Sequence, residues 1–326
     1  MLKLLAIPAV RGVAILALGL ALAALLEAEG LRKQAEIQPA GAERNLALAL
    51  TRPLVDVSRA LHLTTPRHEL QVAIGRQGED QIDAQVHLQL RPVPKPKPRP
   101  VRPAGPAQPP RFTAAHPLRV WVAGDSLAEV PGQALERLGG AIDVVGVESR
   151  LSTGLARPDL YNWFTRLQVV PRTLRPRVAV LSFGADDAHD FMTGVPAGRK
   201  IGLLGSPSWN AEYRRRVDGV TRELAADGID VVWLGLPIPA GAGFRRSYPV
   251  VNRILESVVR AHPKAATFID TWDLLADPHG RYTPYLRVHG TLTLMRQPDG
   301  VHYTQAAGDL IAAQVLAHLR ARFRLG

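Results

Sequence analysis

The stretch Val120 to Ala128 reads VWVAGDSLA, and the fold predicted for the chain follows from it. Its first four residues are apolar, with the β-branched and aromatic side chains typical of a buried strand, and Gly124 ends the run. A strand that ends at Gly-Asp-Ser leaves Ser126 at the carboxyl edge of a sheet, where open α/β sheets bind their ligands. A serine hydroxyl is a weak nucleophile without a base, so this site requires a histidine from another segment.

Such a histidine lies near the C-terminus, in the segment Asp299-Gly300-Val301-His302. Imidazole titrates near neutral pH, so His302 is suited to take the proton of Ser126 and return it to a leaving group. Asp299 is close enough in the chain to accept a hydrogen bond from the other ring nitrogen and fix its tautomer. The two segments therefore predict a Ser-His-Asp site.

With these blocks, the chain resembles the SGNH, or GDSL-type, hydrolase superfamily, and most closely a bacterial membrane-anchored branch without an assigned substrate. The family pattern falls on residues 124–126, on Gly154, on residues 184–187 and on residues 299–302. The resemblance implies a three-layer α/β/α fold with a parallel sheet, an acyl-Ser126 intermediate, and neither cofactor nor metal. It further implies that Asp125, Gly184 and Asp187 support the site.

The resemblance places the oxyanion hole at the backbone N–H groups of Ser126 and Gly154 and at the side chain of residue 186. Glycine at 154 suits a close approach of backbone to ligand, which leaves no space for a Cβ. At 186 the family has asparagine and this chain has Asp186, which carries no donor hydrogen when ionised. Three outcomes are open. Asp186 stays protonated beside Asp187 and can donate, or the two backbone donors alone support the reaction at a reduced rate, or the domain binds its ligand without turning it over.

Some other residues near these blocks have simpler interpretations. The run from Asp186 to Asp190 has the composition of a metal site, but we expect Asp187 to brace the loop instead. Arg245 and Arg246, in a predicted loop over 241–247, are expected at the solvated surface. We expect packing roles, with an aromatic or two able to stack on a sugar, for Tyr161, Trp163, Trp209, Tyr213 and Arg216.

From residue 119 onward, strand-like and helix-like segments alternate, which predicts an α/β fold with a parallel sheet and helices on both faces. The predicted strands cover residues 119–123, 142–147, 177–183, 229–234 and 267–269. The predicted helices cover residues 131–138, 158–170, 209–226, 250–262 and 304–323.

The N-terminal third has a different composition. Residues 1–31 contain an uncharged run from Gly12 to Leu26 after Lys3 and Arg11, which predicts a membrane anchor with its N-terminus in the cytoplasm. A cleaved signal peptide, with a small-residue site at Ala21 to Ala23, is the alternative. Residues 32–90 form a small membrane-proximal segment with a helix over 43–63 that is interrupted at Pro53.

Residues 91–118 are predicted to be a linker before a catalytic domain over 119–326. Residues 91–110 contain nine prolines and five basic residues, which favours an extended spacer over recognition of an anionic polymer. The net charge of the chain is +11, yet residues 1–118 already hold 15 Lys and Arg against 9 Asp and Glu. Because no recognition motif accompanies this charge, we predict no nucleic-acid partner. The absence of cysteine excludes disulfides and thiolate metal sites.

These features predict a serine ester hydrolase in the bacterial inner membrane, single-pass, with its C-terminal domain in the periplasm or outside the cell. The family and the location together suggest small acyl esters, such as O-acetyl groups, on a cell-envelope or exported glycan. Two alternatives remain open: an O-acyltransferase that uses the same residues, and a catalytically impaired domain that binds envelope glycan.

Overall fold

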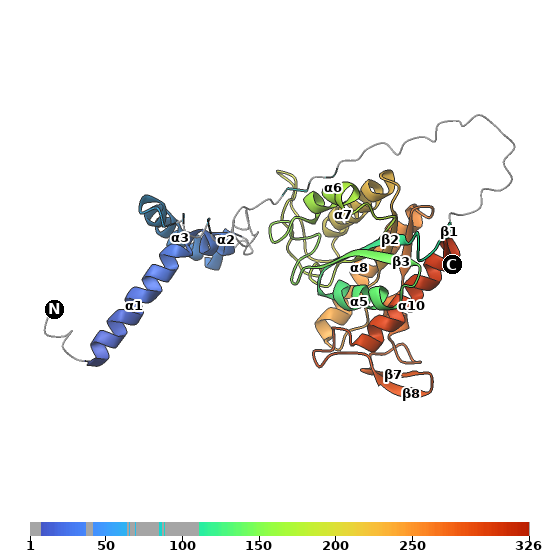
Figure 1. Ribbon diagram of the computed structural model, residues 1–326. Helices are drawn as coiled ribbons and strands as arrows, with labels where there is room; N and C mark the ends of the chain where they lie inside the picture. Colours follow the sequence, from blue (N-terminus) through green and yellow to red (C-terminus); the bar gives the residue numbers. More distant parts are fainter. Residues whose placement is uncertain are drawn as a thin grey trace, which may run out of the picture. The chain divides into compact units, whose positions relative to one another are not determined.

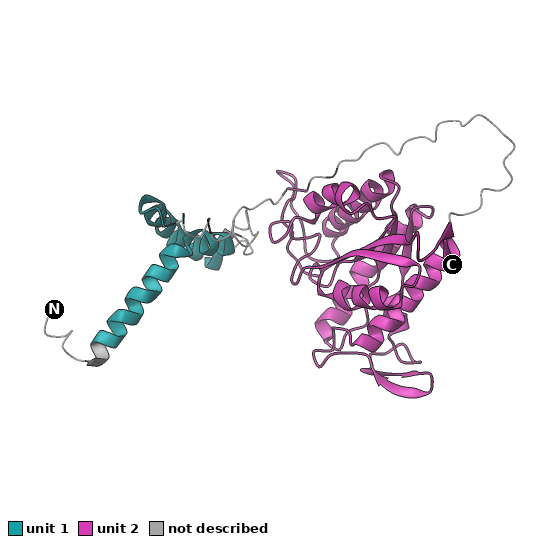
Figure 2. Cartoon of the chain, viewed as in Figure 1, with its two compact units in different colours: residues 1–83 teal, residues 84–326 magenta. Residues whose placement is uncertain are grey.

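The computed structural model describes residues 8–36, 42–63, 65, 69, 85–86, 88 and 111–325. The chain divides into two compact units, residues 1–83 and 84–326 (Figure 2). The proline-rich spacer predicted over 91–110 lies outside the described residues.

The first unit contains the helices α1 (Pro8–Leu26), α2 (Ala28–Glu36) and α3 (Ala42–Ala60). The interruption predicted at Pro53 is wrong, because α3 continues through it. An interior proline removes one backbone hydrogen bond, but α3 packs along α2, buries Val55 and is joined to it by an ion pair from Arg59 to Glu29. Tertiary contacts of this kind offset the local cost of the proline.

The apolar run of α1 does not pass as a membrane span by itself. Among the described residues, no single helix is long and apolar enough, whereas Arg11–Leu26 and Ala28–Ala35 pass together with a 71° bend between them. The anchor over residues 1–31 therefore stays a prediction.

The second unit is built on a five-stranded, entirely parallel sheet in the order β3-β2-β4-β5-β6. The five strands are the ones predicted, with ends that differ by one or two residues, and the central strand β4 is buried along its whole length. Their bounds are β2 Leu118–Gly124, β3 Ile142–Ser149, β4 Val178–Ser182, β5 Asp230–Leu234 and β6 Ala266–Ile269.

Helices cover both faces of this sheet, which gives the predicted three layers (Figure 1). On one face α5 (Glu129–Leu138) packs against α10 (Gln305–Arg322). On the other face α7 (Pro207–Ala226) packs between α6 (Trp163–Thr173) and α8 (Ala242–Ala261). The mixed α/β fold with a parallel sheet is therefore confirmed.

Two of the predicted helices begin more than two residues away from their predicted starts. The side chain of Asn162 accepts hydrogen bonds from the N–H groups of residues 164 and 165, so α6 begins at Trp163 instead of residue 158. The loop predicted over 241–247 is wrong, because α8 begins at Ala242. Phe244 and Tyr248 lie one helical turn apart with ring centres 5.2 Å from each other, a spacing that Gly243 and Pro249 obscure in the sequence.

Several short elements were not predicted, because none of them contains an apolar run. They are β1 (Arg111–Phe112), which pairs in parallel with β9 (Arg324–Leu325), the turn η2 (Ser126–Ala128), the helix α9 (Thr271–Leu274), and an antiparallel hairpin of β7 (Tyr285–Val288) and β8 (Thr291–Leu294). β1 belongs to the second unit, so ordered structure begins before residue 119.

The strand order decides where a ligand can bind. The chain passes from β2 to β3 on one side, and β4 then pairs with the other side of β2. Such a reversal opens a crevice at the carboxyl ends of the strands. The ends of β2, β3 and β4 lead directly into the three sequence blocks at Ser126, Gly154 and Asp186.

Candidate active site

The turn that carries Ser126 depends on a glycine before it. Gly124 has a φ of +155°, and a Cβ added there would lie 1.8 Å from the carbonyl oxygen of Ser182 on β4. Only glycine fits this approach of two neighbouring strands. The chain then turns sharply, and Ser126 opens the short helical turn η2 in a half-buried position.

Asp125 ties this turn to the third block. Its buried carboxylate accepts hydrogen bonds from the backbone N–H of Leu127 at 3.0 Å, of Gly184 at 3.1 Å and of Ala185 at 3.0 Å. Burial, followed by the charge of Asp186, raises the pKa of Asp125 well above its usual value. Asp125 therefore fixes the ends of β2 and β4 relative to each other.

A chain of short hydrogen bonds joins the three predicted catalytic residues. The Nε2 atom of His302 lies 2.7 Å from Ser126 Oγ, and its Nδ1 atom lies 2.7 Å from Asp299 Oδ2. The other carboxylate oxygen of Asp299 accepts the N–H groups of Val301 at 2.8 Å and His302 at 2.9 Å. Asp299 thereby holds both the ring and the backbone of His302.

The charge of Asp299 suits this position. Partial burial raises the pKa of Asp299, but the hydrogen bonds from Val301 and His302 outweigh burial, so its pKa lies below the usual value. An ionised Asp299 accepts Nδ1–H and leaves Nε2 free to act as a base toward Ser126. The side chains of His302 and Asp299 are 44% and 49% exposed, so an ester and an acceptor can reach them from solvent.

Gly154 lies where predicted, but its surroundings give another reason for glycine. A Cβ added at Gly154 would lie 2.1 Å from Oδ1 of Asp187. The fully buried carboxylate of Asp187 accepts the N–H groups of Leu155 at 2.9 Å and Ala156 at 2.7 Å, and the Tyr213 hydroxyl at 2.8 Å. The glycine makes space for this carboxylate, and Asp187 braces the loop as expected.

Asp186 is half-buried beside these groups. Burial is the largest cause that raises its pKa, and the charge of Asp187 adds to it, whereas the charges of His189 and His302 and the N–H of Ser152 lower it. The net direction is upward, which favours the neutral acid. A neutral carboxyl group can donate a hydrogen bond, as the asparagine of the resembled family would.

The structure does not gather the run from Asp186 to Asp190 around one point. Asp187 accepts hydrogen bonds from the backbone N–H groups of residues 155 and 156, and Asp190 accepts the N–H of Leu204 at 2.6 Å. No group of three or more His, Asp or Glu suited to a metal ion occurs within the described ranges.

Other residues take the simpler roles expected of them. The side chains of Trp163, Trp209, Tyr213 and Arg216 are buried, so the aromatic rings pack in the interior and are unavailable for stacking on a sugar. Arg245 and Arg246 are exposed as expected, although they lie in α8 and not in a loop.

Sequence reasoning also missed residues near the site. Buried Tyr248 of α8 has a raised pKa, first through burial and then through the charges of Asp125 and Asp186. The N–H of Ser152, which lowers the pKa of Asp186, was missed because a backbone group has no signal in the sequence.

Comparison with known proteins identifies the family of the chain. No curated protein matches the chain. Residues 119–318 match a family described as a protein of unknown function, DUF459. The chain belongs to the DUF459 family. The matched part of this DUF459 protein runs from β2 into α10 and includes Ser126, Asp299 and His302.

Solved structures similar to this DUF459 protein include a GDSL-like lipase from Bacteroides thetaiotaomicron, which is 15% identical over 63% of this chain and 88% of that chain, with a TM-score of 0.42. A lipase/acylhydrolase from Enterococcus faecalis is 18% identical over 63% and 96%, with a TM-score of 0.40. A psychrotrophic esterase from Pseudoalteromonas is 11% identical over 63% and 97%, with a TM-score of 0.40.

Proposed function

We propose that the DUF459 domain is a serine ester hydrolase that removes small acyl groups, O-acetyl above all, from a cell-envelope or exported glycan. The observation that carries the proposal is the unbroken chain Ser126, His302, Asp299, with 2.7 Å at both links. Three groups in this order form a nucleophile, a base and a residue that orients the base.

The reaction proceeds in two halves. Ser126 Oγ attacks the ester carbonyl carbon while His302 Nε2 takes the hydroxyl proton. The tetrahedral intermediate then expels the glycan alkoxide, which receives that proton from His302, and acyl-Ser126 remains. A water molecule, deprotonated by His302, attacks the acyl carbon. The second tetrahedral intermediate then expels Ser126 Oγ, which takes that proton back from His302, and the carboxylic acid is released. In this proposal the N–H groups of Ser126 and Gly154 and the neutral acid of Asp186 bind the oxyanion.

The preferred size of the acyl group and the identity of its acceptor can be determined with the full chain. We expect faster hydrolysis of an aryl acetate than of an aryl decanoate, and acetate release from an O-acetylated polysaccharide. A faster rate on the decanoate would contradict the assignment to small acyl groups. Transfer of acetate to added oligosaccharide, with little free acetate, would identify the O-acyltransferase alternative.

The state of Asp186 predicts an unusual pH dependence. The neutral donor is lost as pH rises through the raised pKa of Asp186, so the contribution of this donor to kcat/KM should fall above that pKa. Asp186→Asn supplies a donor at every pH and should raise kcat/KM above that pKa by about 10²-fold. The measurement is the pH profile of kcat/KM for both proteins.

Two outcomes would oppose this use of Asp186. Profiles of the same shape in both proteins would show that residue 186 does not supply a titrating donor. An inactive parent with turnover in Asp186→Asn would favour the second candidate function, a domain that binds glycan without hydrolysing it.

We propose further that the first unit holds the domain at the bacterial inner membrane. Support comes from α1, whose large apolar side chains are 51–73% exposed around the helix at Val13, Ile15, Leu16, Leu18, Leu20 and Leu22. A helix that is apolar on all sides suits lipid better than water. Alkaline phosphatase fused after Gly326 should be active if the C-terminal domain is exported, and inactive if it stays in the cytoplasm.

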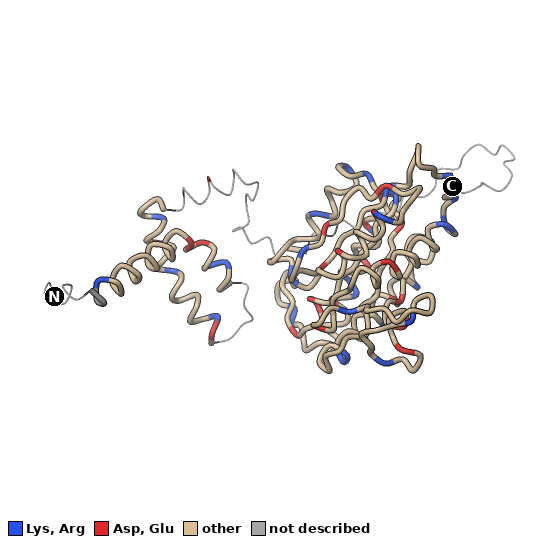
Figure 3. The backbone as a smooth tube through the Cα atoms, turned by 60° about the horizontal axis from the view of Figure 1, so that its bottom comes forward, with Lys and Arg blue, Asp and Glu red and all other residues tan. Residues whose placement is uncertain are grey.

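The charge distribution of the second unit supports the absence of a nucleic-acid partner in this proposal. Lys and Arg positions are interspersed with Asp and Glu positions over the described part of that unit (Figure 3). Proteins that bind nucleic acid gather their basic residues in a patch or stripe.

A further inference from the structure

The loop after β3 is held in place by hydrogen bonds to its backbone groups. The proposed oxyanion donor Gly154 is followed by Leu155 and Ala156, whose side chains are buried. Asp187 accepts both of their N–H groups, at 2.9 and 2.7 Å. A buried carbonyl needs a partner as much as a buried N–H does, so the two carbonyls of the same residues require donors from elsewhere.

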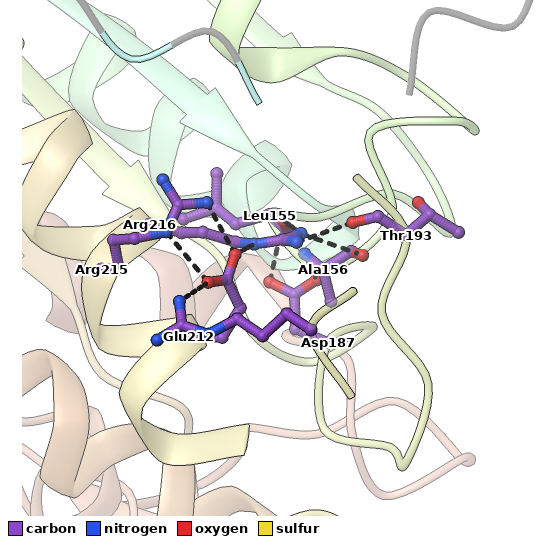
Figure 4. A network of polar contacts seen from close by, with 8 residues as sticks. Leu155, Ala156, Asp187, Thr193, Glu212, Arg215 and Arg216 are labelled. Atoms are coloured by element: carbon purple, nitrogen blue, oxygen red, sulfur yellow. Dashed lines mark hydrogen bonds and ion pairs between the residues drawn. The ribbon is translucent and has the colours of Figure 1, made fainter. Parts of the chain in front are cut away.

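Arg216 of α7 supplies those donors (Figure 4). Its Nη1 donates to the carbonyl of Leu155 at 2.7 Å and to that of Ala156 at 3.2 Å, and its Nη2 donates to the carbonyl of Thr193 at 2.6 Å. The N–H of Thr193 donates in turn to the Ala156 carbonyl at 3.0 Å. One guanidinium therefore fixes the second block and the loop after the third block together.

The guanidinium is itself held rigidly. Its Nε donates to Oε1 of Glu212, one turn earlier on α7, at 2.8 Å, and both side chains are fully buried. Arg215 holds the same carboxylate from the other side with bonds of 2.9 and 2.7 Å. Because the planar fork of arginine presents donors in fixed directions, Arg216 can meet three carbonyls and one carboxylate in a single geometry.

Tyr213, one turn before Arg216 on α7, bonds to Asp187, which holds the N–H groups of the same loop. The face of α7 turned toward the site thus holds the loop in two ways. Arg216 donates directly to the carbonyls of the loop, and Tyr213 donates to Asp187, which accepts the N–H groups of the loop. This arrangement is more than packing, because the bonds from Arg216 Nη1 and the bonds to Asp187 meet on the two residues that follow Gly154.

We propose that Arg216 is a positioning residue for the oxyanion hole, which sets the direction of the Gly154 N–H by fixing residues 155 and 156. The inference rests on the proposed acyl transfer at Ser126. A donor aimed at the oxyanion acts in the transition state, so its displacement lowers kcat more than it changes KM.

The test compares Arg216→Lys with Arg222→Lys in the full chain. Arg222 lies on the same helix and pairs with Asp218 at 3.8 Å near the surface, so it is the matched control. Lysine keeps the charge at 216 but cannot meet the same four oxygens. We expect Arg216→Lys to lower kcat about 10²-fold on an aryl acetate with KM changed less than about threefold, and Arg222→Lys to match the parent.

Amide hydrogen exchange gives a readout that does not depend on turnover. Peptides that contain Leu155 and Ala156 should exchange faster in Arg216→Lys than in the parent or in Arg222→Lys. Tyr213→Phe, which removes only the hydroxyl bond to Asp187, should show a smaller change of the same kind and serves if Arg216→Lys fails to fold.

The possible outcomes distinguish failure of the positioning role from failure of the proposed function. If the parent hydrolyses the ester, Ser126→Ala does not, and Arg216→Lys keeps the parent kcat, then the positioning role is wrong and the proposed function stands. If the parent neither hydrolyses the ester nor reacts at Ser126, the proposed function fails and the catalytic part of this inference fails with it.

Discussion

Replacing Ser126 with alanine should lower kcat/KM for an aryl acetate by about 10⁴-fold or more, because no other group can form the acyl intermediate. The hydroxyl is half-buried at the turn after β2 and meets His302 at 2.7 Å. Alanine leaves Gly124, Asp125 and the backbone of η2 unchanged, so the fold should be preserved. The measurement is steady-state hydrolysis together with thermal unfolding of both proteins.

Ser257→Ala is a suitable control for this substitution. Ser257 lies on α8, donates to the carbonyl of Ile254 at 2.7 Å within its own helix, and accepts a hydrogen bond from Arg214 of α7. Its replacement should leave kcat/KM within about twofold, because none of these groups belongs to the candidate site. Hydrolysis that persists in Ser126→Ala at the parental rate would mean that another nucleophile acts.

Asp299→Asn should lower kcat by roughly 10²- to 10⁴-fold, because the charge that fixes Nδ1–H of His302 is lost. The amide oxygen of asparagine can still accept the N–H groups of Val301 and His302, which Asp299 Oδ1 now accepts at 2.8 and 2.9 Å. The loop should therefore keep its shape while the ring loses its orientation. The measurement is the pH profile of kcat, in which we expect a lower plateau.

The chain offers a matched control for this prediction as well. Asp277 forms a similar turn, with Oδ1 accepting the N–H groups of His279 and Arg281 at 2.8 Å each, and its pKa is lowered mainly by the bond from Arg281. Asp277→Asn should leave kcat unchanged. Equal effects of the two substitutions would show that loop stability, and not the orientation of His302, explains the loss.

Residues 120–123 and 299–302 were enough to predict that Ser126 and His302 lie together, although 176 residues separate them. The five strands could be predicted because buried parallel strands have continuous apolar runs and end at one edge of the sheet. The exposed hairpin of β7 and β8 has no such run and was missed. The start of α8 was missed because Gly243 and Pro249 suggested a loop.

The surroundings of Gly154 show where sequence reasoning ends. A glycine in the second block predicted a close approach, but only the structure identifies the Asp187 carboxylate as the group that approaches. Arg216 was expected to pack, because bonds from a side chain to backbone carbonyls leave no pattern in the sequence. Its placement with Trp209, Tyr213 and Val220 on the buried face of α7 is the signal that singles it out, since a charge there requires partners.

The most direct test of the central claim is reaction of the full chain with a serine-directed alkyl phosphonate, followed by mass spectrometry of the peptides. We expect one phosphonyl group on Ser126, and none when His302 is replaced by glutamine, because the hydroxyl then has no base. An unmodified Ser126 in the parent, or equal modification without His302, would contradict the claim that these residues form a working nucleophile and base.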